Sequence, residues 1–381
     1  MSSVPFYKSV GFWLWIGVFM VFMQVVIGGI TRLTASGLSI TKWEIVTGTL
    51  PPMNAKQWQE EFDLYKETPQ YKKINEGMSM GEFKFIYFWE YIHRLWARTM
   101  GFVFLIPFLI FLYRKRLDRK LIRQLMIVVF LAAIVASLGW IMVASGLINR
   151  PWVNAYKLTI HLSSAIIVYA YLFWITMDYW LSKKRMPTPQ NEEITEENLT
   201  LDSEAATPSE NNKLFFHNPV LKRLIIAIIA LLSVQIVIGG LMSGMKAGIY
   251  YPTFPKMGEE WLPSVVFKAS NWNVENFVNY DVYLFMPALV QLTHRFTAFL
   301  LVFIVLWLLY KASKFRTHYT FKLGLNLLTF MLVMQILLGI LTVISCKGSI
   351  PVTLGVFHQI GALLLLTSAL FVYYPVHRSK P

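Results

Sequence analysis

The chain has few charged residues and almost no cysteine. Only 15% of its 381 residues are Asp, Glu, Lys or Arg, whereas about a quarter are charged in an average soluble domain. Together with a hydrophobic content of 56%, this excludes an ordinary soluble protein and predicts an integral membrane protein. The single cysteine, Cys346, excludes a disulfide within the chain, and we assign it no role.

Long apolar segments predict the membrane-spanning helices. Crossing a hydrocarbon core of about 30 Å takes about 20 residues of helix. Eight segments are long and apolar enough: residues 11–30, 86–113, 124–147, 158–181, 224–244, 284–310, 323–345 and 352–375. We therefore predict an all-α integral membrane protein with eight transmembrane helices in the lipid bilayer.

Acidic residues are fewer than basic ones, so the net charge is +14. The excess base gathers in alternate loops, at residues 114–123, 183–185 and 311–322. By the positive-inside rule these loops and both termini are cytoplasmic, and we expect a multi-pass protein of a bacterial inner (plasma) membrane with no nucleic-acid partner. No cleavable signal peptide is expected, since the first span begins within about ten residues of the start.

The second half of the chain repeats the first. The run from Gln24 to Gly29 reappears as Gln235 to Gly240, and Leu138 to Ile141 parallels Leu338 to Leu341. The glycines predict close helix packing, and the glutamines predict hydrogen bonds between helices. We expect two four-helix bundles related by a pseudo-twofold axis along the membrane normal.

These bundles define two predicted domains and a linker. Residues 1–181 form the first unit, and the connection from residue 31 to residue 84 should contain short helices that cap its outer face. Residues 221–381 form the second unit, with a matching cap between residues 247 and 281. Residues 182–220 between them form an acidic, proline-containing stretch, which predicts a disordered cytoplasmic linker.

Four histidines lie inside the predicted spans, in two pairs that nearly repeat. His93 and His161 belong to the first unit, and His294 and His358 occupy the corresponding places in the second. An imidazole in a bilayer is costly, which makes it a functional candidate. All four should lie at similar depth in the extracytoplasmic half, and two imidazoles on facing helices can hold one haem iron. Zinc, copper or a hydrogen-bonding role remain alternatives.

One carboxylate distinguishes the two predicted sites. Glu90 precedes His93 by three residues and shares its helix face, whereas Gln291 stands at the corresponding position of the second unit. This difference marks the first unit as the chemical site, where Glu90 could take up protons or stabilise positive charge. The alternative is an ion pair with Arg94 that only offsets the cost of burial. Three arginines are candidates for contacts with haem propionates: Arg94, Arg98 and Arg295.

The motifs taken in order resemble those of the haem A synthase family. The matching segments cover nearly the whole chain: Gly28 to Ser39, Trp43 to Pro52, Glu90 to Arg94, Gly139 through Leu147 to His161, Thr253 to Gly258, His294-Arg295 and His358-Gln359. Many relatives carry cysteine pairs in the outer loops, and this chain has only Cys346. A thiol step proposed for those relatives cannot operate here.

The resemblance implies an oxidoreductase for cytochrome oxidase biogenesis. It implies haem b between His294 and His358, and substrate haem O between His93 and His161, with Glu90 needed for activity. The implied reaction oxidises the C8 methyl of haem O, by successive hydroxylations, to the formyl group of haem A. Haem O synthase and cytochrome oxidase assembly factors are the implied partners.

Three other functions are compatible with the residues. A membrane cytochrome with two permanent b haems could oxidise quinol and use Glu90 as a proton exit. A haem carrier or export module would bind haem without changing it. A transporter without haem would use the buried polar residues for its own substrate.

Overall fold

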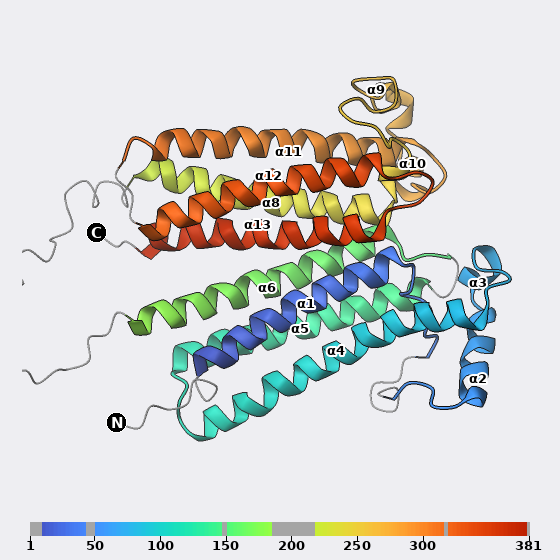
Figure 1. Ribbon diagram of the computed structural model, residues 1–381, viewed down its shortest axis with the longest axis horizontal. Coiled ribbons are helices and arrows are strands. Elements are labelled where there is room, and N and C mark those ends of the chain that lie inside the picture. Colours follow the sequence, from blue (N-terminus) through green and yellow to red (C-terminus); the bar gives the residue numbers. More distant parts are fainter. Residues whose placement is uncertain (1–9, 43–49, 147–150, 185–217, 316–318, 379–381) are drawn as a thin grey trace, which may run out of the picture.

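The computed structural model describes residues 10–42, 50–146, 151–184, 218–315 and 319–378. Its architecture is a bundle of long helices (Figure 1), and eight of those in the described ranges are long and apolar enough to cross a membrane. They are α1 (Val10–Leu33), α4 (Met80–Tyr113), α5 (Arg119–Gly146), α6 (Ala155–Lys184), α8 (Pro219–Gly244), α11 (Phe285–Ala312), α12 (Tyr319–Ile344) and α13 (Val352–Arg378). The prediction of an all-α membrane protein with eight spans is confirmed.

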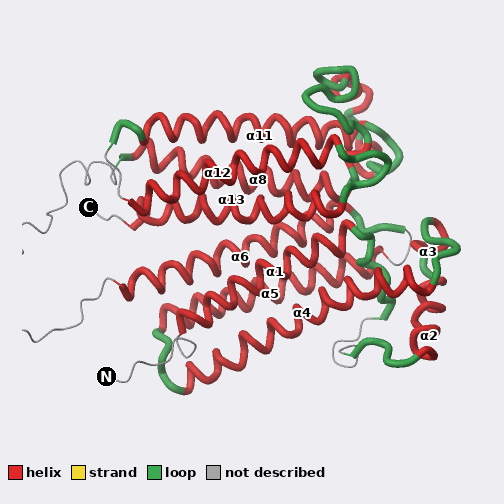
Figure 2. The backbone as a smooth tube through the Cα atoms, in the orientation of Figure 1, coloured by secondary structure: helices red, strands yellow, loops and turns green. Residues whose placement is uncertain are grey.

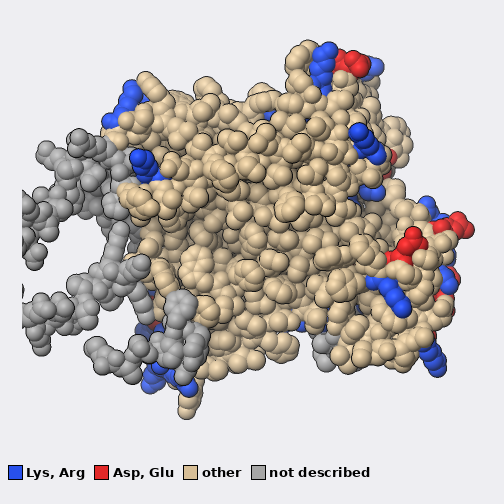
Figure 3. Space-filling model, in the orientation of Figure 1, with Lys and Arg blue, Asp and Glu red and all other residues tan. Residues whose placement is uncertain are grey.

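Charged side chains gather at the two ends of the bundle (Figure 3), and the face in view carries almost none between them. This is the distribution that a hydrocarbon core requires. The start of α1 and the end of α13 lie at the same end of the bundle (Figure 2), as an even number of spans demands. The termini themselves and most of the predicted linker, residues 185–217, lie outside the described residues.

The second span begins six residues before its predicted start at residue 86. Ser79 and Glu82 form a capping box, in which each side chain accepts a hydrogen bond from the other residue's backbone N–H. Because both residues are exposed, α4 can begin beyond the apolar stretch and run into it as one helix. The polar residues before the apolar stretch therefore stabilise the start of the helix.

Each unit packs its helices in the same order. In the first unit α1 lies against α4 and α6, and α5 lies against α6. In the second unit α8 lies against α11 and α13, and α12 lies against α13. Between the units α6 contacts α8, and the corresponding helices α13 and α1 contact each other. The α6–α8 contact thus has its equivalent in the α13–α1 contact, as a pseudo-twofold relation between the units would require.

Small residues bring the two units together near the outer end of the bundle. A Cβ added at Gly244 of α8 would stand only 2.6 Å from the Cβ of Ala155 of α6, so the helices touch almost backbone to backbone there. Arg32, at the end of α1, donates hydrogen bonds to the carbonyls of Ser243 (2.8 Å) and Gly244 (3.1 Å). The close approach and the buried cation together fix the relative position of the units.

Short helices cap the first unit at the end of the bundle opposite the start of α1, within the connection where the sequence predicts short helices. They are α2 (Ala55–Lys66) and α3 (Pro69–Lys73), and their apolar faces pack on α4 around Phe83. Burial raises the pKa of Tyr65 to about 12, and its hydroxyl donates to Gln70. The Gln70 amide in turn donates to the carbonyl of Ala35 (3.0 Å), which ties the cap to the segment that follows α1.

The predicted cap of the second unit is also present. It consists of η4 (Ala247–Ile249), α9 (Ser264–Phe267), η5 (Ala269–Asn271) and α10 (Val274–Val278). Phe277 of α10 and Trp272 pack edge-on against Phe285 at the start of α11. Each unit therefore carries a cap that packs against one of its histidine-bearing helices, α4 in the first unit and α11 in the second.

Replacing Gly244 by Ala should destabilise the protein, because the new methyl group would overlap Ala155. Overpacking of this kind costs about 1–3 kcal/mol, so thermal unfolding in detergent should occur at a lower temperature. Gly101→Ala is the matched control, since a Cβ at Gly101 meets nothing within 4 Å. Equal unfolding temperatures for the two variants would contradict this account of the contact between the units.

Candidate functional site

Each of the four histidine rings lies against a glycine of the preceding long helix. The distances from the place of a glycine Cβ to the nearest ring atom are 3.1 Å for Gly28 and His93, 2.9 Å for Gly139 and His161, 3.6 Å for Gly239 and His294, and 3.0 Å for Gly339 and His358. A side chain at three of these glycines would press on the ring at less than a normal contact distance. The repeated glycines thus leave the space that the histidines occupy.

The two imidazoles of the second unit face each other. The ring centroids of His294 and His358 are 6.3 Å apart, and the ring planes are inclined by 65°. Two imidazoles bound to one metal, each nitrogen about 2 Å from it, have centroids about 6 Å apart. The Nδ1 atoms of both rings are buried and make no hydrogen bond. The spacing and these unpaired nitrogens fit an iron held between the rings.

Glutamines fix the backbone beside three of the histidines. Gln24 donates to the carbonyl of His93 (3.2 Å), and its repeat partner Gln235 donates to the carbonyl of His294 (3.0 Å). Gln335 donates to the carbonyl of His358 (2.9 Å), and its amide also lies 3.4 Å from Nε2 of that ring. The hydrogen bonds between helices that the sequence predicted for these glutamines are confirmed.

His161 is oriented by a backbone carbonyl in the first unit. Its Nδ1 lies 3.0 Å from the carbonyl oxygen of Val135 on α5. When Nδ1 donates to a carbonyl, Nε2 is the nitrogen left to ligate a metal, which is the usual arrangement for ligand histidines. His161 and His93 each pack against a glycine, as their counterparts in the second unit do.

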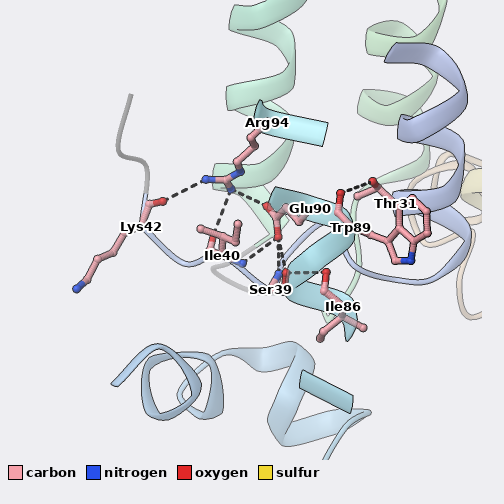
Figure 4. Close-up of polar contacts among 8 residues, drawn as sticks. All are labelled: Thr31, Ser39, Ile40, Lys42, Ile86, Trp89, Glu90 and Arg94. Carbon is pink, nitrogen blue, oxygen red and sulfur yellow. Dashed lines mark hydrogen bonds and ion pairs between the residues drawn. The ribbon is translucent and has the colours of Figure 1, made fainter. Parts of the chain in front are cut away.

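Glu90 is buried in a cluster of hydrogen-bond donors (Figure 4). Its side chain is on α4 and only 3% exposed. One carboxylate oxygen accepts from the Ser39 backbone N–H (2.7 Å), the Ser39 hydroxyl (2.8 Å) and the Ile40 N–H (2.8 Å). The other oxygen accepts from Arg94 at 2.6 Å. All these partners are donors, so they suit an ionised carboxylate.

Arg94 extends the same cluster to the segment that follows α1. Its guanidinium donates to the carbonyls of Ile40 and Lys42, at 3.2 Å each (Figure 4). The predicted ion pair between Glu90 and Arg94 is therefore present, and it does more than offset charge. Together the two side chains bind both the N–H groups and the carbonyls of residues 39–42, and they hold this segment against α4.

In the second unit, Gln291 and Arg295 stand at the positions of Glu90 and Arg94 and bind the corresponding segment, residues 251–255. Gln291 donates to the carbonyl of Tyr251 (3.0 Å), and Arg295 donates to the carbonyls of Thr253 (2.6 Å) and Pro255 (3.0 Å). The backbone presents N–H groups to Glu90 but a carbonyl to Gln291. A carboxylate can only accept, whereas an amide can donate, so the Glu-to-Gln difference matches the local backbone.

The predicted site residues are thus only partly brought together. His294 and His358 face each other, and Glu90 and Arg94 form an ion pair. Arg94 and Arg295 each donate hydrogen bonds to backbone carbonyls. Arg98 is half-buried and lies one turn after Arg94 on α4. Sequence reasoning missed Ser39. Its place in the run after α1 was noted, but a hydroxyl and N–H aimed at Glu90 leave no separate signal in the sequence.

A metal site with three or more His, Cys, Asp or Glu ligands does not occur in the described ranges. Catalytic zinc sites use three such ligands. Paired imidazoles are instead typical of the axial ligation of haem, whose porphyrin supplies the remaining ligands.

The fold and the site define a multi-pass helical membrane protein with two matched histidine pairs near one end. The model of the family described as "Cytochrome oxidase assembly protein" (COX15-CtaA) matches residues 11–370. The chain belongs to this family.

Curated relatives match the chain over almost its full length. A protein named "Heme A synthase" from Nitrosomonas eutropha is 37% identical over 96% of this chain and 93% of its own length. Another of that name from Nitrosospira multiformis is 38% identical, with 97% and 94% covered. "Heme A synthase COX15" from Arabidopsis thaliana is 34% identical over 98% of this chain and 76% of its own length.

Replacing Glu90 by Ala should free the segment of residues 39–42. The substitution leaves the Arg94 cation half-paired in a site that is 13% exposed, and breaking a buried ion pair costs about 3–5 kcal/mol. Hydrogen–deuterium exchange at Ser39 and Ile40 should become much faster. Gln291→Ala, the matched control, removes one neutral hydrogen bond and should leave exchange at residues 39–42 unchanged. Equally slow exchange in both variants would show that Glu90 does not hold this segment.

Proposed function

We propose that this protein oxidises haem O to haem A, converting the C8 methyl group to a formyl group by successive hydroxylations. Haem A produced in this way serves cytochrome oxidase biogenesis. The observation that carries the proposal is that each unit packs two histidines against matched glycines, with His294 and His358 close together in the second, while the buried Glu90 of the first has Gln291 as its counterpart. Membership of the family and relatives named for this activity over nearly the whole chain support it.

The second unit is proposed to hold haem b between His294 and His358. When bound, haem b supplies one-electron redox chemistry. The chain's own contribution is to fix both rings, through Gly239 and Gly339 behind them and Gln335 on the backbone of α13. Arg295, at the outer edge of this pocket, is proposed to face the propionates while it holds the segment of residues 253–256.

The first unit is proposed to hold the substrate, haem O, between His93 and His161. Glu90 and Arg94 pin residues 39–42 beside this place, where the segment covers part of the proposed site. Glu90 also contributes a negative charge that can stabilise positive charge or accept a proton near the reacting edge. Arg94 and Arg98 lie on the same helix as His93 and are proposed to face the propionates.

The orientation and the division into units complete the proposal. By the positive-inside rule, the basic loops support an orientation with both termini in the cytoplasm and both histidine pairs in the extracytoplasmic half of the plasma membrane. Residues 1–181 form the substrate unit and residues 221–381 the haem b unit, with a cytoplasmic linker at 182–220. Haem O synthase and cytochrome oxidase assembly factors are the proposed partners.

Haem analysis of the purified protein tests the assignment of the two units. His294→Ala and His358→Ala should remove the haem b absorption, since each loses one axial ligand, whereas His93→Ala should keep it. His93→Ala should instead lose the haem O and haem A that are extracted from cells supplied with haem O. Retention of two b haems without any haem A in the unmodified protein would favour a di-haem electron-transfer protein instead.

Glu90→Gln separates the chemical role of Glu90 from its structural one. The amide oxygen of Gln can still accept from Ser39 and Ile40, but its NH2 group faces the Arg94 donors, so hydrogen exchange at Ser39 and haem O binding are measured together with activity. Formation of haem A should fall by about a hundredfold or more, as expected when a proton-transferring or charge-stabilising group is lost. Near-normal formation of haem A, with normal hydrogen exchange at Ser39, would make Glu90 a structural anchor only.

A further inference from the structure

A cavity opens at the outer end of the first unit, between α4 and α5. Its volume is about 120 Å³, and it is lined by residues 40–42, Arg94 of α4, and Trp140, Val143 and Ala144 of α5. Sites that enclose a drug-sized ligand measure about 300–1,000 Å³. The cavity is therefore too small to enclose a haem, and it has the size of an entrance that takes one edge of such a molecule.

The cavity adjoins the histidine pair of the first unit. Arg94 directly follows His93 on α4, and Trp140 directly follows Gly139, the glycine against which the His161 ring packs. Val143 lies one helical turn outward from Gly139. A molecule that moves inward from this cavity between α4 and α5 therefore reaches both imidazoles.

The boundary between α4 and α5 is weakly closed. α4 packs on α1 and α5 packs on α6, while α4 and α5 make little contact with each other; the corresponding helices α11 and α12 of the second unit also touch only sparsely. Trp140 and Ile141 on this side of α5 are 50% and 45% exposed, so they face the surface that lipid covers. The cavity thus opens toward the bilayer and not only toward water.

The lining of the cavity matches the chemistry of haem O. This molecule carries two propionates at one edge and a long isoprenoid tail elsewhere, and the tail keeps it in the bilayer. The exposed Lys42 supplies positive charge beside the cavity, and Arg94, whose charge is balanced by Glu90, supplies hydrogen-bond donors there. Trp140, Val143 and Ala144 supply an apolar surface on α5. Propionates can thus stay near the charged outer edge while the tail remains in lipid.

We infer that haem O enters its site, and haem A leaves it, sideways from the bilayer through the boundary between α4 and α5, with the propionate edge toward Lys42 and Arg94. This inference rests on the proposed function. The weak contact between α4 and α5 lies in the first unit, whose haem must be exchanged at every turnover.

A Val143→Trp variant tests the entrance. The indole should fill the cavity and obstruct passage, so uptake of haem O from phosphatidylcholine vesicles, followed by absorption changes, should slow by about tenfold or more. The equilibrium affinity for haem O should stay within about threefold, because Val143 lies outside the histidine pair. The haem b content should match that of the unmodified protein.

Val343→Trp is the matched control, since Val343 stands at the repeat position on α12, four residues after Gly339. It should leave haem O uptake unchanged. Val143→Ala, which removes bulk and carries no risk of overpacking, should take up haem O at least as fast as the unmodified protein. Unchanged uptake in Val143→Trp, or a loss of affinity without a change in the uptake rate, would overturn the inference.

The two proposals fail in different ways. If the unmodified protein takes up haem O from vesicles but never forms haem A, the proposed reaction is wrong while the entrance can still be measured. If the unmodified protein forms haem A and Val143→Trp takes up haem O and forms haem A at the same rates, only the entrance is wrong.

Discussion

The close approach of helices at four glycines is the constraint on which both sites depend. Each glycine leaves room for one imidazole, and each imidazole then lies between two helices of its own unit. Because polar groups are costly in a bilayer, a ring held in this way needs a compensating partner. Carbonyls, glutamines and, in the proposed function, a bound haem supply it. Helix packing and ligand binding are thus set by the same residues.

The outer segments show how one architecture is adapted to two tasks. Two positions one turn apart hold the segment above each site, as Glu90 and Arg94 in one unit and Gln291 and Arg295 in the other. The backbone offers donors in the first case and a carbonyl in the second, which explains the exchange of acid for amide. Glu90 therefore has a structural reason to be present whatever it contributes to the reaction.

Much of the fold could be predicted from the sequence, because membrane spans and their repeats leave strong signals. Apolar length predicts the eight spans, and the internal repeat predicts that Gln24 and Gln235 play equivalent roles in the two units. The early start of α4 could not be predicted, since it depends on a local cap at Ser79. Neither could Ser39, whose importance comes from a contact with a residue 51 positions away. The sequence predicts a common depth for the four histidines. The distance between the His294 and His358 rings can be known only from the structure.

Arg32 makes the two halves of the molecule unequal. Its guanidinium rests on the carbonyls that end α8, where the helix dipole favours a cation. The residue at the repeat position in the second half is Ser243, which carries no charge. Two copies of the second half would lack this contact on both sides, and two copies of the first half would bring two such cations, so this contact favours the pairing of unlike halves. A molecule that arose by doubling would in this way have lost the option of returning to a symmetric dimer.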